Sequence, residues 1–149
     1  MTTNACGSYS RYMSKPIPIG TRGEAETTVE PRHTLTAWKD HLPPVYSTPY
    51  MIGLMEAAGY NGLEPFLEGD EVSVGTAVNI VHRAPAVVGM KIKAEAVLEN
   101  FDGRFYTFKV SAHNGHEVMG YGTIGRAIVS KAKFEARQRG RSQQPATAQ

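Results

Sequence analysis

The chain has 149 residues, of which 41% are hydrophobic and 20% charged, and its net charge at pH 7 is +2. This length predicts one domain with a sizeable core, and the composition excludes disordered and fibrous proteins. So small a net charge gives no reason to expect a nucleic-acid partner. The basic residues concentrate near the C-terminus, where we expect a solvated tail rather than a polyanion contact.

The chain has one cysteine, Cys6, so no disulfide can form within it, which fits a reducing compartment. The segment around Cys6 has no regular pattern that would position a catalytic thiolate. The N-terminus has no apolar run, and no stretch is long and apolar enough to cross a bilayer. We therefore expect a cytoplasmic protein without a membrane partner.

The composition divides the chain into three parts. Residues 1–20 are polar and interrupted by proline and glycine, so we expect a flexible leader. Residues 21–134 are expected to form a single domain, and residues 135–149 a disordered basic tail. The domain starts with a weakly alternating strand over 23–30 and continues into a loop containing Pro43-Pro44.

A helix apolar nearly all round is predicted from residue 48 onward. Ser47 or Thr48 can cap it, and Pro49 suits its first turn, where the missing N–H costs nothing. The helix is expected to end at one of the two glycines that follow residue 58. Four apolar residues recur at helical spacing: Met51, Leu54, Met55 and Ala58.

The rest of the domain alternates as strands. Two-residue turn signals, Asp102-Gly103 and Asn114-Gly115, predict that the last three strands form an antiparallel meander. The order of strand, enclosed helix and four strands predicts an α+β domain, in which a curled antiparallel sheet wraps one long helix. The four predicted strands cover residues 72–82, 90–96, 105–112 and 118–129.

Several familiar sites are excluded by their context. The run Gly120 to Gly125 fits G-x-G-x-x-G, but a dinucleotide site needs a following helix and an acidic residue further on, whereas Arg126 to Ser130 continues as a strand. The five histidines show neither H-E-x-x-H nor Cys/His spacing, so we expect no metal site. No G-x-S-x-G elbow is present.

Glu56 is the one acid in the middle of the apolar helix. A buried carboxylate is costly without a partner, so either this turn of the helix faces water or Glu56 belongs to a pocket. His82 ends a strand whose Val78 and Ile80 should face the helix, which makes it either a core histidine or an acid/base partner. Thr48, two turns before Glu56, is a cap or a third member of such a pocket.

The same residues resemble the fluoroacetyl-CoA thioesterase family over about residues 22–135. Members are hotdog-fold enzymes that hydrolyse short acyl-CoA thioesters, so the resemblance implies a hotdog fold with one long central helix wrapped by a curled antiparallel sheet of about five strands. The resemblance lies in Val45 to Glu56, Val74-Gly-Thr-Ala77, His82, Arg104 to Asn114 and Gly122 to Ala127.

The resemblance also implies a set of site residues. Thr48, Glu56 and His82 match the family's catalytic residues, while Gly75 and Arg126 match positions near the acyl group and the pocket wall. It further implies an acyl-CoA substrate, no cofactor or metal, and a homodimer with active sites at the subunit interface. Whether such dimers stack into a higher oligomer is left open.

One position departs from the family pattern. The fluoroacetyl-specific member has an aromatic lid residue six positions before the catalytic threonine, and this chain has Leu42 there. We therefore do not expect fluoroacetyl-CoA to be the natural substrate. The sequence leaves open the acyl group and whether Glu56 is a nucleophile or a general base. The alternative function is a non-catalytic acyl-CoA-binding or sensing module on the same fold.

Overall fold

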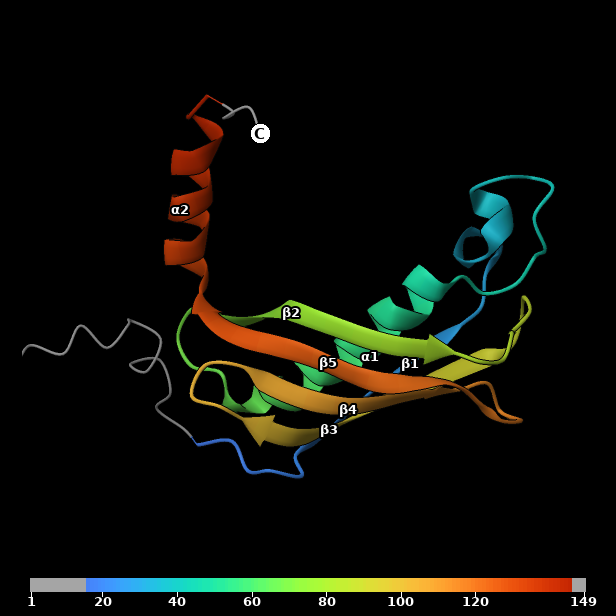
Figure 1. The fold of residues 1–149 in the computed structure, drawn as a ribbon, viewed down its shortest axis with the longest axis horizontal. Coiled ribbons are helices and arrows are strands. Elements are labelled where there is room, and N and C mark those ends of the chain that lie inside the picture. Colours follow the sequence, from blue (N-terminus) through green and yellow to red (C-terminus); the bar gives the residue numbers. More distant parts are fainter. Residues whose placement is uncertain (1–15, 146–149) are drawn as a thin grey trace, which may run out of the picture.

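One antiparallel sheet of five strands forms the body of the computed structural model, which describes residues 16–145 (Figure 1). The strand order across the sheet is β1-β3-β4-β5-β2, and every neighbouring pair is antiparallel. The predicted meander of the last three strands is therefore confirmed. The strands are β1 (Arg22–Thr28), β2 (Glu71–His82), β3 (Lys91–Phe101), β4 (Tyr106–His113) and β5 (Val118–Ser130).

The two predicted turns close this meander. Gly103, between β3 and β4, has a φ of 100°, and Gly115, between β4 and β5, has a φ of 93°, a region that favours glycine. The side chain of the residue before each glycine accepts hydrogen bonds from the backbone that follows it. Local turn chemistry therefore sets the pairing of β3, β4 and β5.

Helix α1 (Thr48–Leu63) lies against one face of the sheet, and this confirms the predicted α+β architecture (Figure 1). Its buried residues Met51, Met55 and Ala58 join the alternating inward residues of β3, β4 and β5 in one core. Gly23 on β1 permits close approach, since a Cβ there would collide with the backbone of Ala58 and Gly62. Helix and sheet are thus in direct backbone contact at this point.

The start of α1 differs from the prediction. Ser47 is the N-cap, but neither its hydroxyl nor that of Thr48 caps the helix by a side-chain hydrogen bond. The Ser47 backbone carbonyl instead accepts from the N–H groups of Tyr50 and Met51. The Thr48 hydroxyl is thereby left for a contact outside the helix.

Strand β2 is an edge of the sheet and contains a β-bulge. Gly75 pairs with Arg126 and Ala77 with Gly125, so Thr76 is the extra residue. An extra residue reverses the alternation of side chains. Accordingly, Ser73 is buried before the bulge, whereas the even-numbered Ile80 packs on the core after it. Val78, which was expected to face the helix, is 51% exposed because this edge is uncovered.

Helix α2 (Lys131–Ser142) stands away from the sheet at the end of β5 (Figure 1). The Ser130 hydroxyl caps it by accepting from the Lys133 N–H, and the Asp70 carboxylate accepts from the Ala132 N–H and the Ser130 hydroxyl. These hydrogen bonds hold the pKa of Asp70 below its usual value. Every residue of α2 is exposed.

Helix α2 includes part of the segment that was expected to be a disordered tail. The sequence suggested disorder from residue 135, whereas the chain is helical as far as Ser142. Residues 1–15, with most of the predicted leader, and residues 146–149 lie outside the described part. Among the helices of residues 16–145, none combines the length and the apolar character needed to span a membrane.

Candidate active site

Glu56 lies on α1 beside the bulge of β2 and forms an ion pair with Arg126 of β5. The Glu56 Oε2 atom is 2.6 Å from a terminal nitrogen of Arg126, and the two side chains are 25% and 7% exposed. Gly75 faces the same carboxylate, because a Cβ at this position would lie 3.2 Å from Glu56 Cδ. The lone acid of the apolar helix is therefore largely buried between α1, β2 and β5 and has a cation as its partner.

The two oxygens of Glu56 have different surroundings. Oε2 accepts from Arg126, whereas Oε1 is enclosed and has no hydrogen-bond partner among the described residues. A buried oxygen of this kind is normally satisfied by a protein group, a water molecule or a ligand. Oε1 is therefore the carboxylate oxygen that the contacts within the chain leave without a donor.

Ser73 completes this part of the site, and the sequence analysis did not single it out. Its hydroxyl accepts from Arg126 Nε at 3.0 Å, and its carbonyl accepts from a terminal nitrogen of Arg126 at 2.9 Å. The ring of Tyr60 lies 6.0 Å from the guanidinium, which is within reach of a cation–π contact. A bulge placed at Thr76 would have revealed Ser73, because it puts residue 73 on the buried side.

His82 and Thr48 form the second part of the site. His82 Nδ1 is 2.8 Å from the Thr48 hydroxyl, and His82 Nε2 is 3.0 Å from the Ala84 carbonyl. A carbonyl can only accept, so Nε2 carries the proton, and in neutral His82 Nδ1 accepts from Thr48. Both ring nitrogens are occupied, while Thr48 is exposed. Proton transfer between His82 and a ligand would therefore pass through the Thr48 hydroxyl.

The structure divides the three predicted catalytic residues between two separate contacts, Thr48 with His82 and Glu56 with Arg126. Within the chain no hydrogen bond joins Glu56 to His82, since each has the partners already named. Thr48 and Glu56 are eight residues apart on α1, which corresponds to about 12 Å along the helix axis. The sequence suggested His82 as the partner of Glu56, whereas within the chain His82 contacts Thr48 and Arg126 contacts Glu56.

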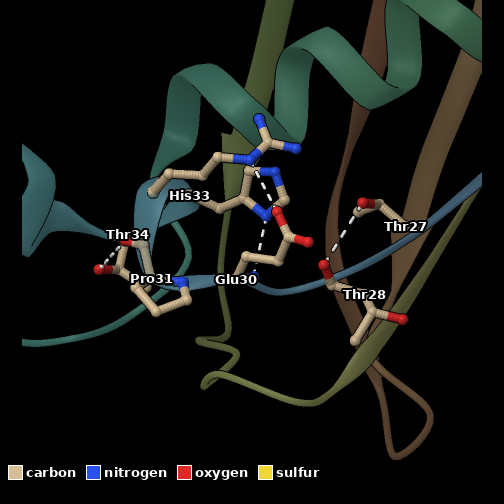
Figure 2. A network of polar contacts seen from close by, with 7 residues as sticks. Thr27, Thr28, Glu30, Pro31, His33 and Thr34 are labelled. Carbon is tan, nitrogen blue, oxygen red and sulfur yellow. Dashed lines mark hydrogen bonds and ion pairs between the residues drawn. The ribbon is translucent and has the colours of Figure 1, made fainter.

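Leu42 lies in the irregular segment between η3 (Leu35–Ala37) and α1, where it is half-buried. Figure 2 shows the polar network that precedes this segment, at η2 (Pro31–His33), where the ring of His33 lies beside Glu30. The His33 Nδ1 atom accepts from the Glu30 backbone N–H at 2.9 Å, and Arg32 Nε donates to the Glu30 carboxylate at 2.7 Å. This turn is joined to the start of α1 by the Ser47 N–H, which donates to the His33 carbonyl at 2.9 Å.

Metal binding finds no support in this region. Among residues 16–145, no group of three histidine, cysteine, aspartate or glutamate side chains is arranged to hold a metal ion. The polar groups of the site are a carboxylate, a guanidinium, an imidazole and two hydroxyls. These groups can bind and orient a carbonyl compound, transfer protons and provide a nucleophile.

Comparison with known proteins gives one consistent family. The family model described as "FlK: Fluoroacetyl-CoA-specific thioesterase" matches residues 29–132. A fluoroacetyl-CoA thioesterase from Streptantibioticus cattleyicolor is 39% identical over 98 residues, which cover 66% of this chain and 70% of the relative.

Solved structures agree with this match. A structure of the fluoroacetyl-CoA thioesterase FlK superimposes with a TM-score of 0.80 at 32% identity, covering 88% of this chain and all of the other. A Thermus thermophilus protein described as a thioesterase superfamily member has a TM-score of 0.80 at 35% identity and covers 86% and 95% of the two chains.

A hot-dog-like protein from Thermanaerovibrio acidaminovorans shares the fold at 22% identity, with a TM-score of 0.78 and coverage of 93% and 100%. The hotdog fold expected from the sequence is thus confirmed. Because the family match covers well over half of its residues, the chain belongs to the fluoroacetyl-CoA-specific thioesterase family, a family of hotdog-fold thioester hydrolases.

Proposed function

We propose that this protein is an acyl-CoA thioesterase that hydrolyses a short or small acyl-CoA to the carboxylic acid and free CoA. The observation that carries the proposal is the Glu56 carboxylate. It lies against Gly75, forms an ion pair with Arg126, and has one enclosed oxygen without a hydrogen-bond partner. In the reaction water supplies the new C–O bond, the C–S bond breaks and sulfur receives a proton. This chemistry uses no metal or redox cofactor.

Glu56 is the residue proposed to act on the thioester. As a nucleophile, the carboxylate would attack the thioester carbonyl and expel the CoA thiolate, forming an anhydride that water then hydrolyses. As a general base, the carboxylate would take a proton from the attacking water. Both routes use the carboxylate form of Glu56, and Arg126 donates to its Oε2 at 2.6 Å. Arg126 is therefore proposed to orient Glu56 and to form part of the pocket wall.

Thr48 and His82 are proposed to transfer the protons. His82 Nδ1 makes the Thr48 hydroxyl more basic at its oxygen, and this hydroxyl is the exposed end of the pair. The Thr48 hydroxyl would pass a proton from the attacking water to His82 Nδ1, and the imidazolium so formed would return that proton through the same hydroxyl to sulfur. The Ala84 carbonyl supports this role because it fixes the ring in one tautomer.

The Thr48–His82 pair of one protomer can approach the Glu56–Arg126 pair of the other if two copies form a homodimer through their β2 edge strands. An edge strand with exposed Val78 and Val81 has unpaired backbone groups, and a second copy can cover them by antiparallel pairing. Pairing about the middle of β2 would bring the partner's His82 to the start of this strand, on the side of Gly75 and Glu56. We therefore propose active sites at the subunit interface, each using residues of both protomers.

The size of the acyl group is proposed from the family. The relatives are named for a two-carbon acyl group, and Leu42 stands where the fluoroacetyl-specific member has an aromatic lid residue. A smaller aliphatic side chain at this position leaves more room beside the acyl group. We accordingly propose small acyl-CoA substrates other than fluoroacetyl-CoA.

The proposed activity is tested by following thiol release over a panel of acyl-CoA thioesters of increasing acyl length. Wild-type protein should release CoA from short members, and Glu56→Gln should lower this rate by at least about 100-fold, as is common when a reacting group is removed. Glu64→Gln is the matched control, because Glu64 is an exposed acid at the end of the same helix. Equal turnover by Glu56→Gln and wild type would exclude the assignment.

The same panel separates the enzyme from a non-catalytic acyl-CoA-binding module. Binding in calorimetry without release of CoA from any thioester would identify the module.

The shared site has its own test, in which the inactive Glu56→Gln and His82→Asn proteins are mixed and allowed to exchange subunits. If each site combines Glu56 of one protomer with His82 of the other, about one quarter of wild-type activity should return. A mixture that remains inactive would place both residues in one protomer's site.

A further inference from the structure

Ser73 occupies two of the three nitrogens of the guanidinium that holds Glu56. Its hydroxyl accepts from Arg126 Nε, its carbonyl accepts from one terminal nitrogen, and the other terminal nitrogen is 2.6 Å from Glu56 Oε2. Ser73 is 6% exposed and Arg126 is likewise buried. Because the guanidinium is planar and rigid, fixing two nitrogens sets the direction of the third.

The surroundings leave Arg126 little freedom apart from these contacts. On α1, Gly59 makes room for the arginine, since a Cβ there would lie 3.2 Å from Arg126 Cδ. Tyr60 lies near the guanidinium, and Gly75 faces the Glu56 carboxylate. The position of the Glu56 carboxylate is therefore defined by a chain of contacts that begins at Ser73.

We propose that Ser73 is a positioning residue that acts through Arg126 to orient Glu56. The expected effect of Ser73 on the reaction rate rests on the proposed thioesterase function. The expected effect of Ser73 on the Arg126–Glu56 ion pair rests on the contacts alone. Loss of the hydroxyl leaves the buried Nε of Arg126 without an acceptor, so the guanidinium turns toward another partner and the Glu56 carboxylate moves with it. The chemistry then slows while acyl-CoA binding is retained.

The test compares Ser73→Ala with Ser73→Thr, which keeps the hydroxyl, and with Ser130→Ala, which removes a similarly buried serine hydroxyl that bonds Asp70. Ser73→Ala should lower kcat by about 10- to 100-fold with little change in KM, because misplacing a reacting group by about 1 Å costs this much. Ser73→Thr should recover most of the rate, and Ser130→Ala should keep it. Folded Ser73→Ala with wild-type kcat would overturn the proposal.

A double-mutant cycle isolates the route through Arg126. In an Arg126→Met background, Ser73→Ala should cause no further loss of kcat, whereas independent losses that multiply would overturn the proposal. If the wild type hydrolyses no acyl-CoA, the proposed function fails, but this inference is still tested by urea unfolding. Ser73→Ala and Glu56→Gln should then be coupled in unfolding free energy, and strict additivity would overturn it.

A second, independent inference concerns the exposed face of α2. Phe134, Arg137, Gln138 and Arg141 follow i, i+3, i+4 and i+7 spacing and share one side of this helix. Phe134 is exposed, and neither arginine forms an ion pair with an acid in the described part of the chain. A helix of 12 residues without a covering partner is marginal in water. This face therefore suits a ligand that is both aromatic and anionic.

We propose that this face binds the phosphorylated adenosine end of the CoA substrate. Its charge is complementary to the phosphates, guanidinium groups suit phosphate oxygens, and an aromatic ring suits a purine. Ser130 follows Arg126 by four strand residues, so α2 starts about 13 Å from the Glu56–Arg126 pair. The pantetheine arm of CoA separates the thioester from the phosphates and can bridge this gap. This inference also rests on the proposed function.

The test uses one acyl group on two thiols, CoA and N-acetylcysteamine, which lacks the nucleotide. Arg137→Gln with Arg141→Gln should raise KM for the CoA thioester by about tenfold and leave the N-acetylcysteamine thioester unaffected. Lys109→Gln, which removes an exposed cation on β4, is the matched control. The proposal that α2 binds the nucleotide end of CoA would be overturned by equal effects on both thioesters, by no effect on either, or by a changed oligomeric state. If neither thioester is hydrolysed, binding of adenosine 3′,5′-bisphosphate should still be weakened by the double variant, and unchanged binding would overturn it.

Discussion

Gly75→Ala tests directly how the site holds its carboxylate. The new Cβ would lie 3.2 Å from Glu56 Cδ and closer still to Oε2, where ordinary contact begins at 3.4 Å. The carboxylate must therefore move by up to about 1 Å, a displacement that costs about 100-fold in rate, or about 2.7 kcal/mol of transition-state stabilisation. The same movement stretches the 2.6 Å contact with Arg126.

The assay is kcat/KM for the acyl-CoA that wild type hydrolyses fastest, measured beside the unfolding free energy. Gly53→Ala is the matched control, because a Cβ at Gly53 meets no atom within 4 Å. On a helix this change should raise the unfolding free energy by up to about 1 kcal/mol and preserve activity. A folded Gly75→Ala protein with wild-type kcat/KM would refute the reasoning, because Glu56 would then not depend on the missing side chain at residue 75.

Three further outcomes are expected. Gly23→Ala should lower the unfolding free energy in urea by about 3 kcal/mol or more, because its Cβ collides with the Ala58 backbone, and a smaller loss would show that α1 can shift. Burial raises the pKa of Tyr46 to about 12 from 10.0, so its contribution to stability is complete below pH 10 and is lost as the pH rises toward 12. Alkaline unfolding followed by tyrosinate absorbance should show this loss, and Tyr46→Phe should reduce it; an identical curve would contradict the assignment. Asp70→Asn should speed amide hydrogen exchange throughout α2, because this carboxylate accepts from the Ala132 N–H, and unchanged exchange would show that α2 does not depend on it.

The sequence predicted the elements well because their signals are local. Turn glycines, alternating strands and an apolar helix after Pro49 are each visible within a short window, and together they define the α+β sheet and its meander. The tail was the exception. Its polar composition suggested disorder, but α2 is anchored by Asp70, which lies far away in the chain, and no local pattern contains this contact.

The site was predicted less completely than the fold. Glu56 stood out as a lone acid on an apolar helix, but His82, suggested as its partner, contacts Thr48 within the chain. The partner of Glu56 was missed because Arg126 belongs to a glycine-rich strand with no charge pattern around it. Ser73 was missed because a strict alternation through β2 puts residue 73 on the outer side, and the bulge at Thr76 cannot be recognised without the pairing strand.

The open edge of β2 matters before the protein ever meets its substrate. A newly synthesised chain that folds alone carries a strand with free N–H and C=O groups beside an exposed Val78. Such a strand is equally able to recruit a correct copy and a misfolded one. In the proposed homodimer, pairing with a correct copy removes this edge from the reach of misfolded chains, so dimer formation and aggregation compete for the same strand.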